Sequence, residues 1–338
     1  MTAPRLPEVS ITPLADAYGR VATDLRVSLT DRCNLRCEYC MPPEGLDWMP
    51  TDQTLTDDEV VRLVTIAVTR LGVEEVRFTG GEPLLRRGLV DIVARTHDLG
   101  VETSLTTNGL GLHHTARSLA AAGLDRLNVS LDTIRPETFV QITRRDRLAD
   151  VMRGLEAAAA AGLRPVKVNA VLLRGVNDDQ APELARWCID RGYELRFIEQ
   201  MPLDAQHSWS RAEMITADEI HEILEGVFEL TPAGEPRGSA PAELFDVDGG
   251  PARIGIIASV TRPFCGDCDR VRLTADGQVR NCLFAREESD LRTALRSGAS
   301  DDEIAARWVV AVKGKRPGHG IDDLSFLQPT RPMSAIGG

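Results

Sequence analysis

The sequence lacks the marks of an exported or membrane-spanning protein. No apolar run approaches the roughly 20 residues that span a bilayer, and residues 1–10 have no basic start followed by an apolar core. The net charge of −12 argues against a protein that coats nucleic acid or an anionic membrane. We therefore expect a cytoplasmic protein with neither nucleic-acid nor membrane partners.

Two common nucleotide-binding signatures are missing as well. There is no Gly-x4-Gly-Lys-Ser/Thr loop and no convincing Gly-x-Gly-x2-Gly fingerprint, so P-loop and Rossmann binding are both unsupported. The composition is ordinary for a globular enzyme, with 43% hydrophobic and 27% charged residues. The 338 residues suffice for one large domain or two modest ones.

The seven cysteines are the most informative residues. In a chain without an export signal, clustered cysteines are more often metal ligands than disulfides. Six of the seven fall in two tight groups, whereas Cys188 stands alone on a predicted helix and is expected to be a core thiol. The six histidines form no metal-spaced pair, so we assign them structural or surface roles.

The first group, Cys33, Cys37 and Cys40, places three thiols within eight residues, directly after a predicted strand. Three thiols can hold three irons of a cubane cluster and leave the fourth iron open. S-adenosylmethionine can chelate such an iron, and its reductive cleavage gives a 5′-deoxyadenosyl radical. A zinc site or unliganded thiols are the alternatives, but zinc normally takes four protein ligands and no fourth is evident nearby.

The second group, Cys265, Cys268 and Cys282, is less specific when it is taken alone. Its Cys-x2-Cys pair resembles a zinc ribbon, which needs a fourth ligand, and neither Cys188 nor His319 has ribbon-like spacing. Because the first group already suits a cubane, a second cubane whose open iron could meet a substrate is the preferred interpretation.

Strand-like and helix-like segments alternate through the first two thirds of the chain. The expected strands are Leu25–Thr30, Glu75–Thr79, Glu102–Thr106, Arg126–Leu131, Val166–Leu172 and Glu194–Ile198. A capping box at Thr56 and Glu59 predicts a helix directly after it, and a second box at Thr216 and Glu219 predicts a helix over 217–224. Further helices are expected over 88–99, 113–122, 148–161, 181–191 and 301–312. Six β-α repeats predict a parallel sheet, either doubly wound or a full or partial barrel.

Polar residues follow or end every one of these strands, among them Thr79–Pro83 and Thr106–Gly109. Buried parallel strands usually read as apolar runs, so this pattern places the active site at the carboxyl ends of the strands. Gly80 and Gly81 permit close approach of the backbone to a ligand; a plain strand-to-helix turn is the alternative.

Basic residues occur inside or at the edge of several apolar strands: Arg26, Arg77, Lys167 and Arg196. Such residues are rarely buried unless they are paired, so each could meet an internal carboxylate or keep its charged end in water. Together with Arg270 and Arg272 beside the second cysteine group, they look like the lining for a polyanionic ligand. A nucleoside triphosphate is a sensible candidate.

The stretch Thr231–Pro251 is rich in proline, glycine and alanine and is the best candidate for a boundary. We expect one unit over residues 1–230 and a C-terminal segment over residues 231–338 that carries the second cysteine group.

Taken together, the motifs resemble a known family. Cys33-x3-Cys37-x2-Cys40, with Tyr39 before the last cysteine, and Gly80-Gly81-Glu82-Pro83 are similar to the radical S-adenosylmethionine superfamily. The fuller set closely resembles the GTP 3′,8-cyclases, which open molybdenum-cofactor biosynthesis. This set comprises SLTDRCNLRCEYCMP, VRFTGGEPLLR, TTNG, LNVSLDT, KVNAV, RFIEQMP, FCGDCDRVRLT and a terminal Gly337-Gly338.

The resemblance implies an incomplete six-unit β/α barrel, a partial TIM-type barrel, closed by a C-terminal iron–sulfur segment. It implies a lyase with two 4Fe–4S clusters and S-adenosyl-L-methionine that cyclises GTP to (8S)-3′,8-cyclo-7,8-dihydroguanosine 5′-triphosphate, releasing 5′-deoxyadenosine and methionine. The implied partners are a reductase or flavodoxin-type electron donor and a downstream cyclic pyranopterin monophosphate synthase, with the chain as a monomer or homodimer.

The resemblance also assigns roles to individual residues. The implied metal ligands are Cys33, Cys37, Cys40, Cys265, Cys268 and Cys282. The implied S-adenosylmethionine contacts are Tyr39, Gly81, Ser130 and Met201. The implied GTP contacts are Arg26, Arg77, Thr106, Lys167, Arg270, Val271 and Arg272. The terminal Gly337-Gly338 resembles a tail that reaches into the active site; without the resemblance it would be a frayed end.

Two other functions stay open on the residues alone. A different radical S-adenosylmethionine enzyme, such as a peptide-modifying one with auxiliary clusters, would have no need of the basic lining. A non-catalytic iron–sulfur or zinc protein that senses redox state would leave Gly80–Pro83 unexplained.

Overall fold

The computed structural model describes residues 11–337 and is built on one twelve-stranded sheet. The strands within this part of the chain are β1 (Asp24–Ser28), β2 (Glu75–Thr79), β3 (Glu102–Thr107), β4 (Arg126–Ser130), β5 (Val166–Val171), β6 (Glu194–Ile198), β7 (Leu230–Pro232), β8 (Glu243–Val247), β9 (Arg253–Ile257), β10 (Arg270–Leu273), β11 (Gln278–Arg280) and β12 (Ser289–Asp290). Their order is β12-β11-β10-β1-β2-β3-β4-β5-β6-β9-β8-β7. The chain therefore has an α/β fold.

The six central strands, β1 to β6, are parallel and lie in sequence order, as the β-α repeats predicted. The C-terminal part of the chain extends both edges of this sheet: β10 pairs in parallel with β1, and β9 pairs in parallel with β6. Outside them, β11, β12, β8 and β7 add antiparallel strands. The sheet stays open, with β12 and β7 as its two edges.

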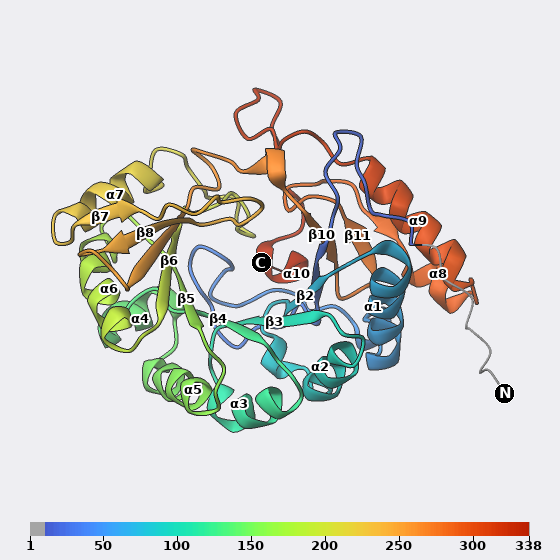
Figure 1. Ribbon diagram of the computed structural model, residues 1–338, viewed down its shortest axis with the longest axis horizontal. Helices are drawn as coiled ribbons and strands as arrows, with labels where there is room; N and C mark the ends of the chain where they lie inside the picture. The colour runs from blue at the N-terminus through green and yellow to red at the C-terminus, as the bar shows by residue number, and fades with distance from the viewer. Residues whose placement is uncertain (1–10, 338) are drawn as a thin grey trace.

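Helices cover the outer side of the curved sheet, and Figure 1 shows α1 to α7 following its convex side. The α-helices between residues 11 and 337 are α1 (Asp57–Leu71), α2 (Leu89–His97), α3 (Leu112–Ala121), α4 (Pro136–Thr143), α5 (Leu148–Ala160), α6 (Ala181–Asp190), α7 (Ala217–Glu225), α8 (Arg292–Arg296), α9 (Asp301–Lys313) and α10 (Met333–Ile336). The short α10 lies inside the concave side (Figure 1). None of these helices is long and apolar enough to cross a membrane.

Local sequence signals explain where the helices begin. Both predicted capping boxes are present, at Thr56 with Glu59 and at Thr216 with Glu219, and each satisfies amide groups that the first helical turn leaves free. A third box, Ser300 with Glu303, opens α9 and was not predicted. The apolar face of α1 is buried against the sheet, and the helix ends at Gly72, whose φ of +75° suits glycine.

The predicted strands and helices are confirmed to within two residues at each end. The strand after residue 24 ends at Ser28 instead of Thr30, because the chain then turns into the first cysteine loop. Helix α4 was not predicted; it has only 8 residues and no side-chain cap, although Pro136 opens it. The strands β7 to β12 were also missed; β7, β11 and β12 have only 2 or 3 residues, and no α-helix within residues 243–273 separates β8, β9 and β10 into further β-α repeats.

The stretch Thr231–Pro251 holds strand β8 and most of β7, which continue the sheet beyond β9. The main hydrophobic core likewise includes residues from both sides of this stretch, for example Leu195 and Leu273. The composition of the stretch therefore reflects a turn-rich antiparallel ribbon at one edge of the sheet.

Candidate active site

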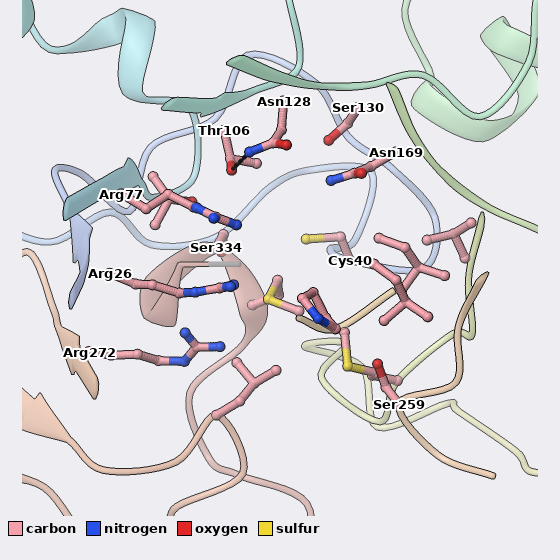
Figure 2. A pocket seen from close by; sticks show the side chains of 18 of the residues that line it. Arg26, Cys40, Arg77, Thr106, Asn128, Ser130, Asn169, Ser259, Arg272 and Ser334 are labelled. Carbon is pink, nitrogen blue, oxygen red and sulfur yellow. Dashed lines mark hydrogen bonds between the residues drawn. The ribbon is translucent and has the colours of Figure 1, made fainter. Parts of the chain in front are cut away.

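One cavity of about 340 Å³ lies at the carboxyl ends of the central strands and receives side chains from both cysteine groups. Its walls include all six clustered cysteines, which come from the loop after β1, from the turn before β10 and from the segment after β11. Residues far apart in the sequence therefore meet here, as the polar strand ends predicted. Figure 2 shows several of the lining side chains pointing toward one another.

The first cysteine loop, residues 33–41, is held by two arginines that bind its carbonyl groups. Arg36 Nη1 donates to the carbonyls of Cys33 and Leu35, both at 2.8 Å. Arg144 Nη1 donates to the carbonyls of Arg36 and Met41, both at 2.9 Å. These bonds fix the backbone and leave the three thiols free to face the cavity.

Burial favours the protonated form of the thiols of this loop. Burial raises the pKa of Cys40 to about 12, and burial together with the charge of Asp132 raises the pKa of Cys37. Since the thiolate is the form that binds a metal, occupation of the loop by iron must release these protons.

Two buried carboxyl groups stand near the first cysteine loop. Glu82 accepts hydrogen bonds from Thr107 Oγ1 at 2.6 Å and from the amide of Asn108 at 2.7 Å, and burial raises its pKa to about 7. Asp132 accepts from the Tyr39 hydroxyl at 2.9 Å, and burial raises its pKa to about 6. The first cysteine group therefore has two titratable carboxyl groups beside it, in addition to the cations Arg36 and Arg144 that hold its backbone.

Gly80 and Gly81 let two loops of the chain approach each other closely. A Cβ atom on Gly80 would lie 2.4 Å from the carbonyl oxygen of Thr30, and one on Gly81 would lie 2.4 Å from that of Arg32. The φ of Gly80 is also +142°, which side chains disfavour. Both glycines line the cavity, so the close approach explains the residue type and still leaves the backbone facing a ligand.

The second cysteine group lies among cations. Lys315 is buried, and its ammonium is 3.3 Å from Cys268 Sγ. Burial alone would raise the pKa of Cys268, but the charge of Lys315 and the amide of Arg270 lower it below its usual value. Arg20 Nη1 donates to the carbonyl of Cys265 at 2.6 Å.

A row of three guanidinium groups forms one wall of the cavity. Arg272 on β10, Arg26 on β1 and Arg77 on β2 are directly opposite one another in the parallel pairing of these strands. Figure 2 shows the three side chains side by side. Nε of Arg26 and both Nε and Nη1 of Arg272 are buried without a hydrogen-bond partner among the described residues. Such donors are costly to bury unpaired, so the row is suited to an anion.

A layer of carboxylates lies two residues before the arginines on the same strands. Asp24 is 3.5 Å from Arg26, and Glu75 is 2.8 Å from Arg77. Glu194 likewise pairs with Arg196 on β6 at 2.5 Å. Internal ion pairs, the alternative interpretation of these cations, are therefore present. They do not balance the cations one for one, because Arg26, Arg77, Arg270 and Arg272 all lie close enough to Asp24 to lower the pKa of that single carboxyl group.

Most of the predicted contact residues lie on the wall of the cavity. These are Tyr39, Gly81, Ser130 and Met201 for S-adenosylmethionine, and Arg26, Arg77, Thr106, Arg270 and Arg272 for GTP. Two predicted residues lie off the wall: Lys167 and Val271. Lys167 is two residues before Asn169 on β5 and is opposite Glu194, whereas the side chain of Val271 is buried in the hydrophobic core.

The C-terminal segment enters the cavity. Met333 and Ser334 of α10 line it, and the backbone amide of Ser334 hydrogen bonds to Cys40. Gly337 lies so close to β2 that a Cβ atom there would be 2.6 Å from Thr79 Cγ2. The partner glycine of the predicted tail, Gly338, lies outside the described residues.

Several further lining residues were given no role of their own from the sequence. Asp132 and Asn169 belong to the polar residues at the ends of β4 and β5 that predicted the site, and both line the cavity. Asn128 on β4 was missed, although it lies two residues before Ser130, so a period-two count of polar positions in that strand could have found it. Ser259 and Phe264 stand in loops and carry no comparable signal.

The geometry can be compared with what different metals require. Among residues 11–337, no three histidine, cysteine or acidic side chains converge as a single metal ion would need. The thiolates of a cubane bind different irons and therefore need not converge on one point. Two sets of three thiols that face one cavity fit two clusters, each with an iron open toward the cavity.

Comparisons with known proteins agree with this site. The Radical SAM superfamily model matches residues 27–188, and the Molybdenum Cofactor Synthesis C model matches residues 193–321. A GTP 3′,8-cyclase of Streptomyces coelicolor is 67% identical over 328 residues, which cover 96% of each chain. One of Corynebacterium glutamicum is 60% identical over 336 residues, which cover 96% of this chain and 89% of that protein.

The chain belongs to the GTP 3′,8-cyclase family. It is a radical S-adenosylmethionine enzyme, and the family uses one 4Fe–4S cluster with S-adenosylmethionine and carries a second cluster in its C-terminal part. Streptococcus suis SuiB has a similar fold, with a TM-score of 0.61 at 14% identity, over 89% of this chain and 68% of SuiB.

Proposed function

We propose that this GTP 3′,8-cyclase family member converts GTP to (8S)-3′,8-cyclo-7,8-dihydroguanosine 5′-triphosphate, the first step of molybdenum cofactor biosynthesis. One observation carries the proposal: both groups of three thiols and the row of Arg272, Arg26 and Arg77 face the same cavity. A radical source and a polyanionic substrate need to meet in one water-poor space, and this cavity supplies it.

When bound, the cluster and S-adenosylmethionine would supply a 5′-deoxyadenosyl radical, at the cost of one electron from the donor, and this radical would take the hydrogen at C3′ of GTP. Bonding of C3′ to C8 would leave an unpaired electron on the guanine ring, so a second electron from the donor and a proton would complete the dihydro product, with 5′-deoxyadenosine and methionine released. Cys33, Cys37 and Cys40 would hold the first cluster. Cys265, Cys268 and Cys282 would hold the second, with its open iron toward guanine.

The residues near the first cysteine loop would orient S-adenosylmethionine. Tyr39, Gly81, Ser130 and Met201 stand on the wall around that loop. The cofactor carries a net positive charge, which the ionised form of Asp132 on the cavity wall would favour. Gly81 also lines the cavity, so its backbone would face the amino acid part of the cofactor.

The arginine row would bind the triphosphate. Arg26, Arg77, Arg270 and Arg272 present guanidinium groups to the cavity, and Thr106 adds a hydroxyl. Lys167 would add its charge from just below the wall, and Val271 would contribute only backbone atoms, because its side chain is buried in the core. Positioning of GTP by these groups would place the ribose between the two metal sites.

The wider architecture supports the same function. We interpret β1 to β6 as an incomplete six-unit β/α barrel, a partial TIM-type barrel, formed by residues 1–230 and closed by the iron–sulfur segment of residues 231–338. The terminal Gly337-Gly338 would act as a tail in the active site. Seven free cysteines suit a reducing cytoplasm. The electron donor would be a reductase or flavodoxin-type protein, the product would pass to a cyclic pyranopterin monophosphate synthase, and the chain would act as a monomer or homodimer.

The test is a product analysis by mass spectrometry. Protein reconstituted with iron and sulfide under anaerobic conditions should, with reductant, S-adenosylmethionine and GTP, give equal amounts of 5′-deoxyadenosine and the cyclised nucleotide. Formation of 5′-deoxyadenosine without a product derived from GTP would contradict the substrate and spare the radical chemistry. Cys188→Ala is the matched control, since Cys188 is a buried core thiol remote from both groups in sequence and should keep both clusters.

A further inference from the structure

Lysine is rare in this chain, and its position is therefore informative. Only Lys167, Lys313 and Lys315 occur among the 39 basic lysine and arginine residues. Lys313 is exposed at the end of α9, whereas Lys315, two residues later, is only 5% exposed. A buried lysine needs a partner, because the charged ammonium is costly to remove from water.

The partners of Lys315 all belong to the second cysteine group and the strand that follows it. Its Nζ lies 3.0 Å from the carbonyl oxygen of Cys268, 2.9 Å from that of Arg270 and 3.3 Å from Cys268 Sγ. The ammonium has three donors around one compact charge, and here each donor has an acceptor. A planar guanidinium would not direct its donors to three converging acceptors in this way.

The segment that carries Lys315 is itself tied to the cysteine turn. Arg20 Nη1 bridges the carbonyl of Cys265 at 2.6 Å and that of Pro317 at 2.9 Å. Arg20 Nη2 donates to the carbonyl of Arg316 at 2.6 Å, and Asp16 holds the other side of this guanidinium. A second cation thus fixes the chain directly after Lys315 against the same turn.

We infer that Lys315 is a positioning residue of the second metal site, which compensates the charge of the Cys268 thiolate and fixes the start of the arginine strand β10 relative to that site. The inference rests on the proposed function, which places a 4Fe–4S cluster at Cys265, Cys268 and Cys282. Since Arg270 and Arg272 follow on the same strand, Lys315 couples the position of the cluster to that of the triphosphate-binding groups.

Two consequences distinguish this role from simple packing. A positive charge with a hydrogen bond to a cluster sulfur favours the reduced state, so the reduction potential of the second cluster depends on Lys315. The affinity for GTP depends on it as well, through the placement of Arg270 and Arg272.

The direct test uses the rarity of lysine. A full-length chain with Cys33, Cys37 and Cys40 changed to alanine holds only the second cluster, and growth on ε-15N-lysine labels three side-chain nitrogens. Changing Lys167→Arg and Lys313→Arg leaves Lys315 as the one labelled lysine. Pulsed electron paramagnetic resonance of the reduced cluster should then show coupling to 15N. A correctly loaded cluster without this coupling would overturn the inference.

The functional test compares matched substitutions. Lys315→Met should lower the midpoint potential of the second cluster and weaken GTP binding about tenfold, whereas Lys313→Met should change neither and Lys315→Arg should keep the potential closer to that of the parent. Parental potential and parental GTP affinity in Lys315→Met, at full iron content, would contradict the inference. If no chain with intact Cys265, Cys268 and Cys282 binds a second cluster, the proposed function fails instead.

Discussion

The two cysteine groups share a cavity but differ in the charged side chains around them. The first has the carboxyl groups of Asp132 and Glu82 nearby, with the cations Arg36 and Arg144 behind its backbone. The second lies against Lys315 and the strand of Arg270 and Arg272.

The difference in charge indicates which small molecule each site binds. S-adenosylmethionine carries a net positive charge, which the carboxylate of Asp132 on the wall of the first site favours, whereas GTP is a polyanion that needs the basic side of the cavity. Two chemically similar metal sites can therefore select different small molecules, because the side chains around them differ in charge.

The largest expected effect separates the two sites by their products. Cys40→Ala should abolish cleavage of S-adenosylmethionine, because it removes a ligand of the first cluster. Cys268→Ala should still form some 5′-deoxyadenosine but no cyclised nucleotide, as measured by mass spectrometry at matched iron content. Loss of all cleavage in Cys268→Ala, with the first cluster intact, would mean that the sites are not functionally distinct.

The next effect concerns the arginine row. Arg26→Ala removes a buried cation with a free donor and should weaken GTP binding by roughly tenfold to a hundredfold, since a hydrogen bond to a charged group contributes about 1.5–3 kcal/mol. Affinity for S-adenosylmethionine should hardly change. Arg117→Ala, at an exposed position on α3, is the control for both titrations. An equal loss of affinity for GTP and for S-adenosylmethionine in Arg26→Ala would contradict the assignment of the two ligands to different sites.

A smaller effect is expected for the carboxylate at the first site. Asp132→Asn removes the negative charge and keeps the shape of the side chain: its oxygen can accept from the amide of Val171, and its NH2 group can donate to the Tyr39 hydroxyl. It should weaken S-adenosylmethionine binding roughly threefold to tenfold, about 1 kcal/mol, and leave GTP binding unchanged. Asp146→Asn changes an exposed residue and serves as the control. Equilibrium binding measures the affinity for both ligands. An unchanged affinity for S-adenosylmethionine would show that the charge of Asp132 does not contribute to binding at the first site.

The smallest effect is a proton linkage at Lys167. Burial and the neighbouring Arg196 lower the pKa of Lys167 to about 8, so at a pH of about 8.5 much of it is neutral in the free protein. Phosphate groups favour the charged form and raise this pKa, so binding of GTP should take up a fraction of a proton, and the affinity should fall as the pH rises. Calorimetry in buffers of different ionisation enthalpy measures the uptake. The proton uptake should vanish in Lys167→Met and persist in Lys313→Met. Uptake that persists in both variants would mean that a group other than Lys167 binds the proton.

Much of the fold could be predicted because its signals are local. Apolar and polar residues alternate in most of the six central strands, and capping boxes mark the starts of α1 and α7. The outer strands escaped prediction because β12 has only 2 residues and β7 only 3, too few for a periodic pattern. They are ordered by pairing with neighbours that are distant in sequence.

The site likewise has features that local sequence predicts and features that depend on contacts between distant residues. The cysteine spacing and the basic residues in strands pointed to the metal sites and to an anion, because ligand spacing is a local property. The contacts of Lys315 with Cys268 and Arg270 join positions more than 40 residues apart, and nothing in the local sequence marks them. The ion pairs of Arg77 with Glu75 and of Arg196 with Glu194 depend on strand geometry, which places alternate residues on one face.

The radical made at the first site should act on GTP held at the second, inside one cavity. Following deuterium from GTP labelled at C3′ during a single turnover tests this transfer directly. We expect deuterium in the released 5′-deoxyadenosine, together with one cyclised nucleotide for each labelled molecule. Unlabelled 5′-deoxyadenosine formed alongside unchanged labelled GTP would contradict it.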